Sequence, residues 1–327
     1  MWSGRNEVFR HLGFLWTELS LPDAIAAAAD AGFDAVECHW PYDTPADQVS
    51  AALRRTGLGM LGLNTRRGDP KAGENGLAAL PGRGPEARAA IEEAIGYARD
   101  IDAACVHVMA GFAEGEPARE AFCENLGHAC RTAAPHGITI LIEPLNRYDA
   151  PGYFLTTTTQ ALSIMDEVAA DNIRLMFDCY HAQLMEGDLS HRIEALLPRI
   201  GHIQFASVPD RGPPDRDEVN YAHIFDLIDR LGYDRPLGAE YNPGWRPKTR
   251  SDGCRGSGPN PGLAPKSTAR HAPRRTREYV RVAKKALQIS SLFREMRALS
   301  SMRLKTRRGR RLASSISESR SKDRGRG

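Results

Sequence analysis

Hydrophobic residues in the first 245 positions follow two alternating patterns. Short runs of mostly apolar, β-type residues recur eight times, at 14–19, 34–40, 59–64, 104–111, 138–145, 173–180, 202–207 and 236–241. Segments with helical spacing of apolar residues separate them, at 21–31, 45–56, 85–100, 116–135, 159–169, 189–198 and 221–231. Glycines in the turns at 31–33 and 231–233 are typical of a helix end before the next strand.

The alternation indicates the fold class. The apolar runs are continuous rather than alternating with polar residues, which is typical of parallel strands covered by helices. Eight such repeats in about 240 residues predict an α/β fold, a (β/α)8 TIM barrel over residues 1–245. A doubly wound open sheet is the alternative. No GxGxxG follows the first run, which argues against the dinucleotide-binding form of that alternative.

Charge separates the chain into two parts. The net charge of +3 over 327 residues conceals 20 Lys and Arg against 36 Asp and Glu in residues 1–245, and 24 against 5 in residues 246–327. An acidic barrel is a poor partner for nucleic acid or an anionic membrane, so nucleic acid is expected to bind only through the basic tail. The stretch RLKTRRGRR at 303–311 would suit phosphate backbones.

The tail of residues 246–327 does not continue the barrel pattern. It is rich in Arg, Pro, Gly and Ser, and we expect it to be disordered apart from an amphipathic stretch at 278–299. The abrupt change of charge and pattern leads us to the hypothesis that the tail is a shifted reading frame. Resequencing the codons for residues 245–260 tests it, and an independently confirmed frame through Gly327 would contradict it.

Other features of composition bear on location. No apolar run reaches the roughly 18 residues of a membrane span, and the N-terminal residues lack a secretory signal pattern. Six cysteines show no CxxC spacing and lie mostly in apolar stretches, as free thiols do. These observations predict a cytoplasmic protein.

Four neighbouring runs carry an oxygen-bearing side chain at or near their ends: Glu143, Asp178, Gln204 and Glu240. The carboxyl ends of barrel strands carry the chemistry of this fold, so these side chains should converge at one side of the barrel mouth. Each one alone has an ordinary structural explanation, such as a salt-bridged strand end. Together they would place three repelling carboxylates in a buried site.

A divalent cation resolves that repulsion. Three carboxylates and one amide oxygen form a hard ligand set that suits Mg²⁺ or Mn²⁺, whereas zinc more often recruits His or Cys. Such an ion can hold adjacent substrate oxygens next to a carbon that loses a proton. Two glutamates, Glu143 and Glu240, could then remove a proton and return one at the neighbouring carbon. The predicted reaction is an aldose–ketose type isomerisation.

The chain resembles the hydroxypyruvate isomerase family, including the 2-oxo-tetronate isomerases, within the xylose-isomerase-like TIM barrels. The stretches that carry this resemblance are GDPKAGENGLAALPGR (68–83), HVMAG (107–111), IEPLNRYDAPGYFL (142–155), FDCYHAQLMEGDL (177–189), HIQ (202–204) and GAEYNPG (238–244). Their order and spacing imply a metal-dependent isomerase of a small hydroxy-oxo acid, either hydroxypyruvate or a 2-oxo-tetronate.

The resemblance also implies roles for single residues. It makes Glu143 and Glu240 the acid–base pair and metal ligands, with Asp178 and Gln204 as the other ligands. His181 matches a substrate-contacting histidine, and orienting a carboxylate is its alternative role. Arg211 matches an arginine that binds a polar or anionic substrate, and a solvated loop charge is its alternative. Three further residues are pocket candidates: Asn146, Tyr148 and His107, the last of which we expect to be a core histidine.

The chain departs from the family around the substrate. The first run reads HLGFLWTEL, Asn64 is followed by Thr65-Arg66-Arg67, and the loop after the seventh run reads SVPDRGPPDRDE. Rival functions are a sugar 3-epimerase or an inosose-type dehydratase on the same barrel, a relative of endonuclease IV, and a non-catalytic barrel with a nucleic-acid-binding tail. Related epimerases tend to have a histidine where Gln204 stands, and endonuclease IV needs many histidines. Self-association into a homo-oligomer is also possible for such a barrel.

Overall fold

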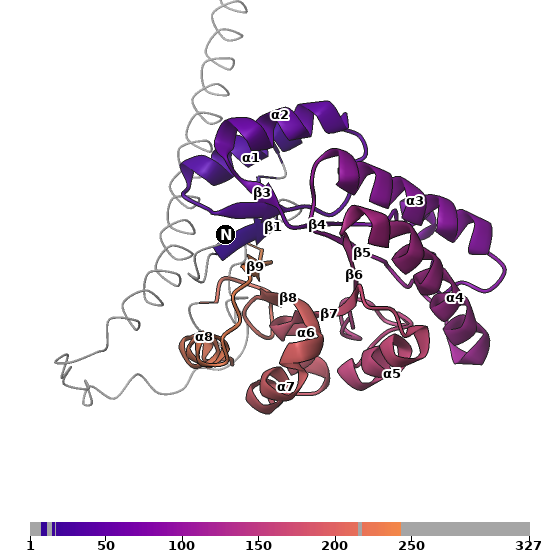
Figure 1. The fold of residues 1–327 in the computed structure, drawn as a ribbon. Coiled ribbons are helices and arrows are strands. Elements are labelled where there is room, and N and C mark those ends of the chain that lie inside the picture. The colour runs from indigo at the N-terminus through magenta and orange to yellow at the C-terminus, as the bar shows by residue number, and fades with distance from the viewer. Residues whose placement is uncertain (1–7, 12–14, 17, 215–217, 243–327) are drawn as a thin grey trace, which may run out of the picture.

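The computed structural model describes residues 8–11, 15–16, 18–214 and 218–242 (Figure 1). The predicted C-terminal tail and its amphipathic stretch lie outside the described residues. None of the described helices is long and apolar enough to cross a lipid bilayer.

Parallel strands form the centre of the molecule. The sheet order is β3-β2-β1-β9-β8-β7-β6-β5-β4. The strands are β1 (Val8–His11), β2 (Ala35–Glu37), β3 (Gly59–Met60), β4 (Gly62–Asn64), β5 (Cys105–His107), β6 (Thr139–Ile142), β7 (Ile173–Asp178), β8 (Ile200–Phe205) and β9 (Leu237–Ala239).

The sheet closes on itself. Its two outermost members, β3 and β4, are halves of one extended run that is interrupted only at Leu61. The backbone N–H of Leu61 donates to the Val36 carbonyl at 2.8 Å, and the N–H of Asn64 donates to the His39 carbonyl at 2.8 Å. These bonds join β2 to both halves of the run. With β3 and β4 counted as one strand, the nine segments form an eight-stranded closed barrel. The predicted TIM barrel is therefore confirmed.

Helices surround the barrel (Figure 1). Their buried residues recur at helical spacing, as at Phe122, Leu126, Ala129 and Ala133 of α4, because one face of each helix packs on the strands. The helices are α1 (Leu21–Asp30), α2 (Ala46–Thr56), α3 (Gly84–Asp100), α4 (Gly115–Ala133), α5 (Thr158–Val168), α6 (Cys179–Met185), α7 (Leu189–Leu196) and α8 (Tyr221–Arg230), with 3-10 helices η1 (Pro70–Ala72), η2 (Ala134–His136) and η3 (Leu197–Arg199).

The sequence prediction of the first strand is wrong. The apolar run at 14–19 predicts a strand, but β1 is Val8–His11, and the described residues of that run form bends and a turn. Trp16 has a φ of 57°, in the left-handed region and outside the extended conformation of a regular strand. Leu15 and Trp16 are nevertheless buried, so their hydrophobicity reflects a packed loop rather than a strand.

The sixth run also ends earlier than its pattern predicts. The apolar residues extend over 173–180, but β7 stops at Asp178 and α6 begins at Cys179. The Asp178 side chain accepts a hydrogen bond from the backbone N–H of Tyr180 at 2.9 Å, which caps α6. Residues 179 and 180 are therefore buried residues of a helix. Apolar character alone does not distinguish buried residues of a helix from those of a strand.

Candidate active site

Four buried oxygen-bearing side chains gather at the carboxyl ends of β6 to β9. Glu143 directly follows β6, Asp178 ends β7, Gln204 lies in β8, and Glu240 directly follows β9. Their exposed fractions are 7%, 3%, 1% and 4%. Because these four strands are consecutive neighbours in the sheet, the residues share one side of the barrel mouth. The sequence predicted this grouping.

Arg211 lies between two of these carboxylates. It comes from the loop after β8, and its Nη2 atom is 3.3 Å from Asp178 Oδ2 and 2.7 Å from Glu240 Oε2. Its Nε–H donates to the Glu240 backbone carbonyl at 3.3 Å, and its guanidinium lies 5.0 Å from the centre of the Tyr180 ring. The pKa of Arg211 rises above its usual value because the facing carboxylates outweigh the effect of burial. Arg211, whose side chain is 18% exposed, is thus a half-buried cation paired with the carboxylates of the site rather than a solvated loop charge.

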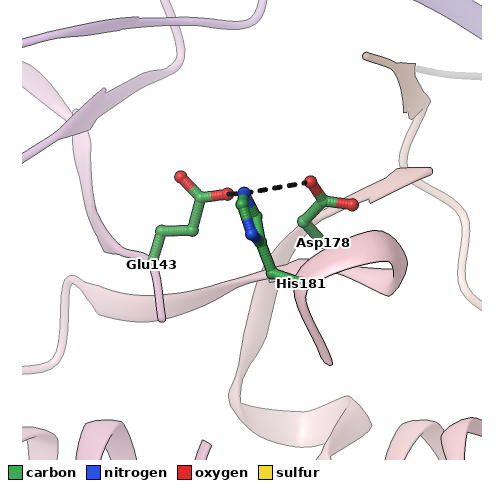
Figure 2. A group of neighbouring side chains, drawn as sticks. All are labelled: Glu143, Asp178 and His181. Carbon is green, nitrogen blue, oxygen red and sulfur yellow. Dashed lines mark ion pairs between the residues drawn. The ribbon is translucent and has the colours of Figure 1, made fainter. Parts of the chain in front are cut away.

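His181 lies between Glu143 and Asp178 (Figure 2). It is on α6, three residues after the capping Asp178. Its Nε2 atom is 3.8 Å from Glu143 Oε1 and 3.7 Å from Asp178 Oδ2. The opposite ring nitrogen, Nδ1, accepts the backbone N–H of Asn146 at 3.0 Å. Because Nδ1 is an acceptor, the neutral ring carries its hydrogen on Nε2.

The protonation of His181 follows from its surroundings. Burial, with Arg211 as a second cause, lowers the pKa of His181 well below its usual value. The Asn146 side-chain Oδ1 accepts from the backbone N–H groups of Tyr148 and Asp149, so its Nδ2 faces His181 Nδ1 at 2.7 Å. His181 therefore offers an N–H donor between two carboxylates, and this role differs from that of a metal ligand.

Carboxyl groups in this site are difficult to ionise together. Burial raises the pKa of Asp178 to about 7, with Arg211 opposing the effect and Glu240 adding to it. Burial raises the pKa of Glu143 well above its usual value, and the Glu240 and Asp178 carboxylates raise it further. Positive charge from a bound ion would reverse this effect, since a nearby opposite charge favours the ionised carboxylate.

The donor set fits a divalent cation. Ligand atoms of Glu143, Asp178 and His181 all lie within 4.8 Å of one another. Glu143 Oε1 and Gln204 Oε1 are buried with no hydrogen-bond partner, an arrangement that costs free energy unless another group uses them. His181 directs an N–H into the site, and Gln204 and Glu240 line the same cavity as Glu143.

Histidines flank the two glutamates. His39, after β2, has its Nε2 atom 3.1 Å from Glu240 Oε1. His107, which ends β5, has its Nδ1 atom 3.7 Å from Glu143 Oε2 and is buried, as a core histidine would be. Both line a cavity of about 580 Å³ inside the barrel, together with Glu143, Gln204 and Glu240. Of the other pocket candidates, Tyr148 is 64% exposed.

The polar residues of this cavity that sequence reasoning missed include Glu37, His39 and His202. Glu37 ends β2 and is 3% exposed. The signal was present, because the run DAVECHW at 34–40 also places a carboxylate at the end of an apolar strand. His39 and His202 show no comparable pattern in the sequence.

Comparison with known proteins agrees with the fold. A family model described as xylose isomerase-like TIM barrel matches residues 25–278. The 2-oxo-tetronate isomerase of Cupriavidus necator is 44% identical over 237 residues, covering 71% of this chain and 91% of that protein. The hydroxypyruvate isomerase of Escherichia coli (strain K12) is 36% identical over 238 residues, covering 71% and 92%.

Solved structures give the same result. The chain is similar to a structure titled AP endonuclease, family 2 from Brucella melitensis, with a TM-score of 0.71 and 38% identity, covering 73% of this chain and 95% of that one. An L-ribulose 3-epimerase has a TM-score of 0.63 at 22% identity, covering 72% and 82%, and this likeness concerns the fold alone.

The fold and the family match define the chain as a xylose isomerase-like TIM barrel. Within that class it belongs to the family of the hydroxypyruvate isomerases and 2-oxo-tetronate isomerases, and it is an enzyme of the isomerase type.

Proposed function

We propose that the protein is a metal-dependent isomerase that interconverts the keto and aldehyde forms of a small hydroxy-oxo acid. Candidate reactions are hydroxypyruvate to tartronate semialdehyde, and a 2-oxo-tetronate to its 3-oxo isomer. The observation that carries the proposal is the burial of Glu143, Asp178, Gln204 and Glu240 on four neighbouring strands, with two of their oxygens lacking a hydrogen-bond partner. The names of the relatives support the substrate class.

The proposed cation is Mg²⁺ or Mn²⁺. Glu143, Asp178, Gln204 and Glu240 would hold it, because carboxylate and amide oxygens are the ligands these ions prefer. When bound, the ion supplies positive charge beside two adjacent substrate oxygens. The same charge allows the crowded carboxylates to ionise together.

The two glutamates would move the protons. One carboxylate removes the proton from the carbon that bears the substrate hydroxyl group, which leaves an enediolate. The other, as a carboxylic acid, returns a proton to the former carbonyl carbon, while the hydroxyl proton moves from one oxygen to the other. The product is an isomer of the substrate, so no oxidant or reductant is needed. General acid–base groups of this type contribute about 10²–10⁴-fold to the rate.

His181 and Arg211 would position the substrate. His181 directs its Nε2–H between Glu143 and Asp178, where it could donate to a substrate oxygen. Arg211 is a half-buried cation next to Asp178 and Glu240, and a guanidinium suits a carboxylate through two parallel hydrogen bonds. An acid substrate would therefore meet a positive group next to Glu240, one of the two proton-transferring glutamates.

Gln204 favours an isomerase over a 3-epimerase or an inosose-type dehydratase, because related epimerases tend to have histidine there. A nuclease of the endonuclease IV type is less well supported, although one similar structure carries an endonuclease title. Among the described residues, the cluster that could hold a metal contains a single histidine. The cytoplasmic location, the homo-oligomer and nucleic-acid binding by the tail stay predictions.

A direct assay tests the proposed function. We expect the metal-stripped protein to be inactive and to convert hydroxypyruvate, or a 2-oxo-tetronate, once Mg²⁺ or Mn²⁺ is added, as followed by proton NMR of the quenched reaction. Ketohexoses should show no epimerisation at the same enzyme concentration. Conversion of a ketohexose but of neither acid would establish the epimerase instead.

A further inference from the structure

A fourth buried carboxylate lies inside the barrel, beside the proposed ligands. Glu37 Oε1 accepts a hydrogen bond from Gln204 Nε2 at 3.2 Å. Glu37 Oε2 lies 2.9 Å from His202 Nε2. Both carboxylate oxygens of Glu37 therefore face a nitrogen of β8, and none of the proposed catalytic steps requires this residue.

The contact with Glu37 decides which way the Gln204 amide points. A side-chain amide has a donor end and an acceptor end, and only the donor end can face an ionised carboxylate. With Nε2 directed at Glu37, Gln204 Oε1 is turned away and is buried without a hydrogen-bond partner. This oxygen is the atom that a cation would need from Gln204. The amide of Gln204 also lines the same cavity as Glu143 and Glu240.

Close packing holds the three side chains in this arrangement. A Cβ atom added at Gly238 on β9 would lie 2.6 Å from Glu37 Oε1, 2.7 Å from Gln204 Cγ and 2.8 Å from His202 Nε2. These distances are shorter than any normal contact, so the three side chains rest directly on the β9 backbone. Gly238 is paired with Gln204 in the sheet and comes two residues before Glu240. The cluster of Glu37, His202 and Gln204 thus packs against β9, the strand that directly precedes the proposed ligand Glu240.

We propose that Glu37, supported by His202, is a positioning residue that turns the Gln204 amide oxygen toward the cation site. The inference rests on the proposed metal-dependent function. It explains why a carboxylate outside the proposed acid–base pair is buried at the end of β2. Groups that orient metal ligands typically change metal affinity by 10–100-fold when they are replaced.

An exchange of the two side-chain types tests this role. Glu37→Gln should lower Mn²⁺ affinity, measured by calorimetry, by about 10-fold or more, because a glutamine at position 37 no longer selects one orientation of Gln204. Gln204→Glu places two carboxylates face to face and should lower the midpoint of thermal unfolding. In the Gln204→Glu background, the further change Glu37→Gln should raise the midpoint of thermal unfolding, because the amide at position 37 donates a hydrogen bond to the carboxylate at position 204. In this background, Glu37→Gln should not reduce Mn²⁺ affinity.

Controls separate positioning from general damage. Glu167→Gln makes the same chemical change in an exposed ion pair with Arg119 and should leave Mn²⁺ affinity unchanged. If Glu37→Gln alone does not fold, the comparison of Gln204→Glu with the double variant gives the same test. The inference is overturned if Glu37→Gln binds Mn²⁺ like the wild type. It is also overturned if Glu37→Gln lowers Mn²⁺ affinity by the same factor in the wild type and in the Gln204→Glu variant. Failure of the wild type itself to bind Mn²⁺ would instead reject the proposed function.

Discussion

Asp178 shows how a single residue can serve the fold and the site together. It ends β7, caps α6 through the Tyr180 N–H, and faces both His181 and Arg211. The cap fixes the start of α6, and the start of α6 fixes where His181 lies. The sequence predicted Asp178 as a ligand because of its place at a strand end. The capping role and the tautomer of His181 depend on hydrogen bonds that only the folded chain forms, so no local pattern could reveal them.

The pKa of Asp178 leads to a prediction about pH. Burial raises this pKa from 3.8 to about 7, so between these pH values the folded metal-free protein holds a proton that the unfolded chain has released. The contribution of Asp178 to the unfolding free energy therefore falls as pH rises from about 4 to about 7. An asparagine at this position cannot titrate. The stability of Asp178→Asn relative to the wild type should therefore increase over this interval.

Urea unfolding in the presence of a chelator, at steps between about pH 4 and pH 8, measures this difference. Asp166→Asn, which changes an exposed ion pair with Arg199, is the matched control, and its difference from the wild type should vary less with pH. A stability difference for Asp178→Asn that stays constant over the whole pH range would contradict the assigned burial effect.

At the scale of elements, the sequence predicted the type and order of the strands and helices better than it predicted where each strand begins and ends. Seven of the eight predicted runs overlap a strand in the structure, because continuous apolar runs between amphipathic helices allow few other folds. The first strand was misplaced because Leu15 and Trp16 are buried in a loop. Helix α6 was missed because its first residues are buried, and Cys179 and Tyr180 continue the apolar run of β7.

Strand β9 provides a prediction at this scale. Gly238→Ala introduces a Cβ within 2.6–2.8 Å of Glu37, Gln204 and His202, which should destabilise the protein by about 1–3 kcal/mol through overpacking. It should also weaken Mn²⁺ binding, because the crowding displaces Gln204. Thermal unfolding and calorimetry measure the two effects.

The matched control for Gly238→Ala is Gly201→Ala on β8. A Cβ at Gly201 would meet Arg174 Cβ at 2.6 Å and Leu141 Cδ2 at 2.7 Å, so its crowding is similar but involves none of the proposed ligands. Both variants should lose stability, and only Gly238→Ala should lose cation affinity. Equal affinity losses in the two variants would show that barrel distortion, and not the Glu37 cluster, is responsible.

At the scale of the whole molecule, the proposed chemistry is confined to the barrel. The proposed acid–base, ligand and substrate-binding residues all lie between Glu143 and Glu240, whereas the excess of positive charge begins at residue 246. The family match extends to residue 278, past the boundary at 245 that the charge reversal predicts. That boundary and the shifted reading frame stay predictions, because the residues concerned lie outside the described part of the chain.

Truncation tests this division. Removal of the residues after about 260 should leave isomerase activity unchanged or improved, because no proposed site residue follows Glu240. Circular dichroism of the truncated protein shows whether it still folds, and an electrophoretic shift assay with both forms shows whether the basic tail binds nucleic acid. A folded truncated protein without activity would place a functional residue in the tail.

The central claim is that two buried glutamates transfer the substrate proton. The most direct measurement follows hydroxypyruvate in deuterium oxide by NMR, with Mg²⁺ bound to the wild type, Glu143→Gln and Glu240→Gln. Glutamine keeps an oxygen for the cation but cannot accept a proton, so kcat should fall by about 10²–10⁴-fold in each variant. The variant that keeps the base should still exchange deuterium into the substrate carbon, and the variant without it should not. Near-normal turnover by both variants with the cation bound would contradict the account.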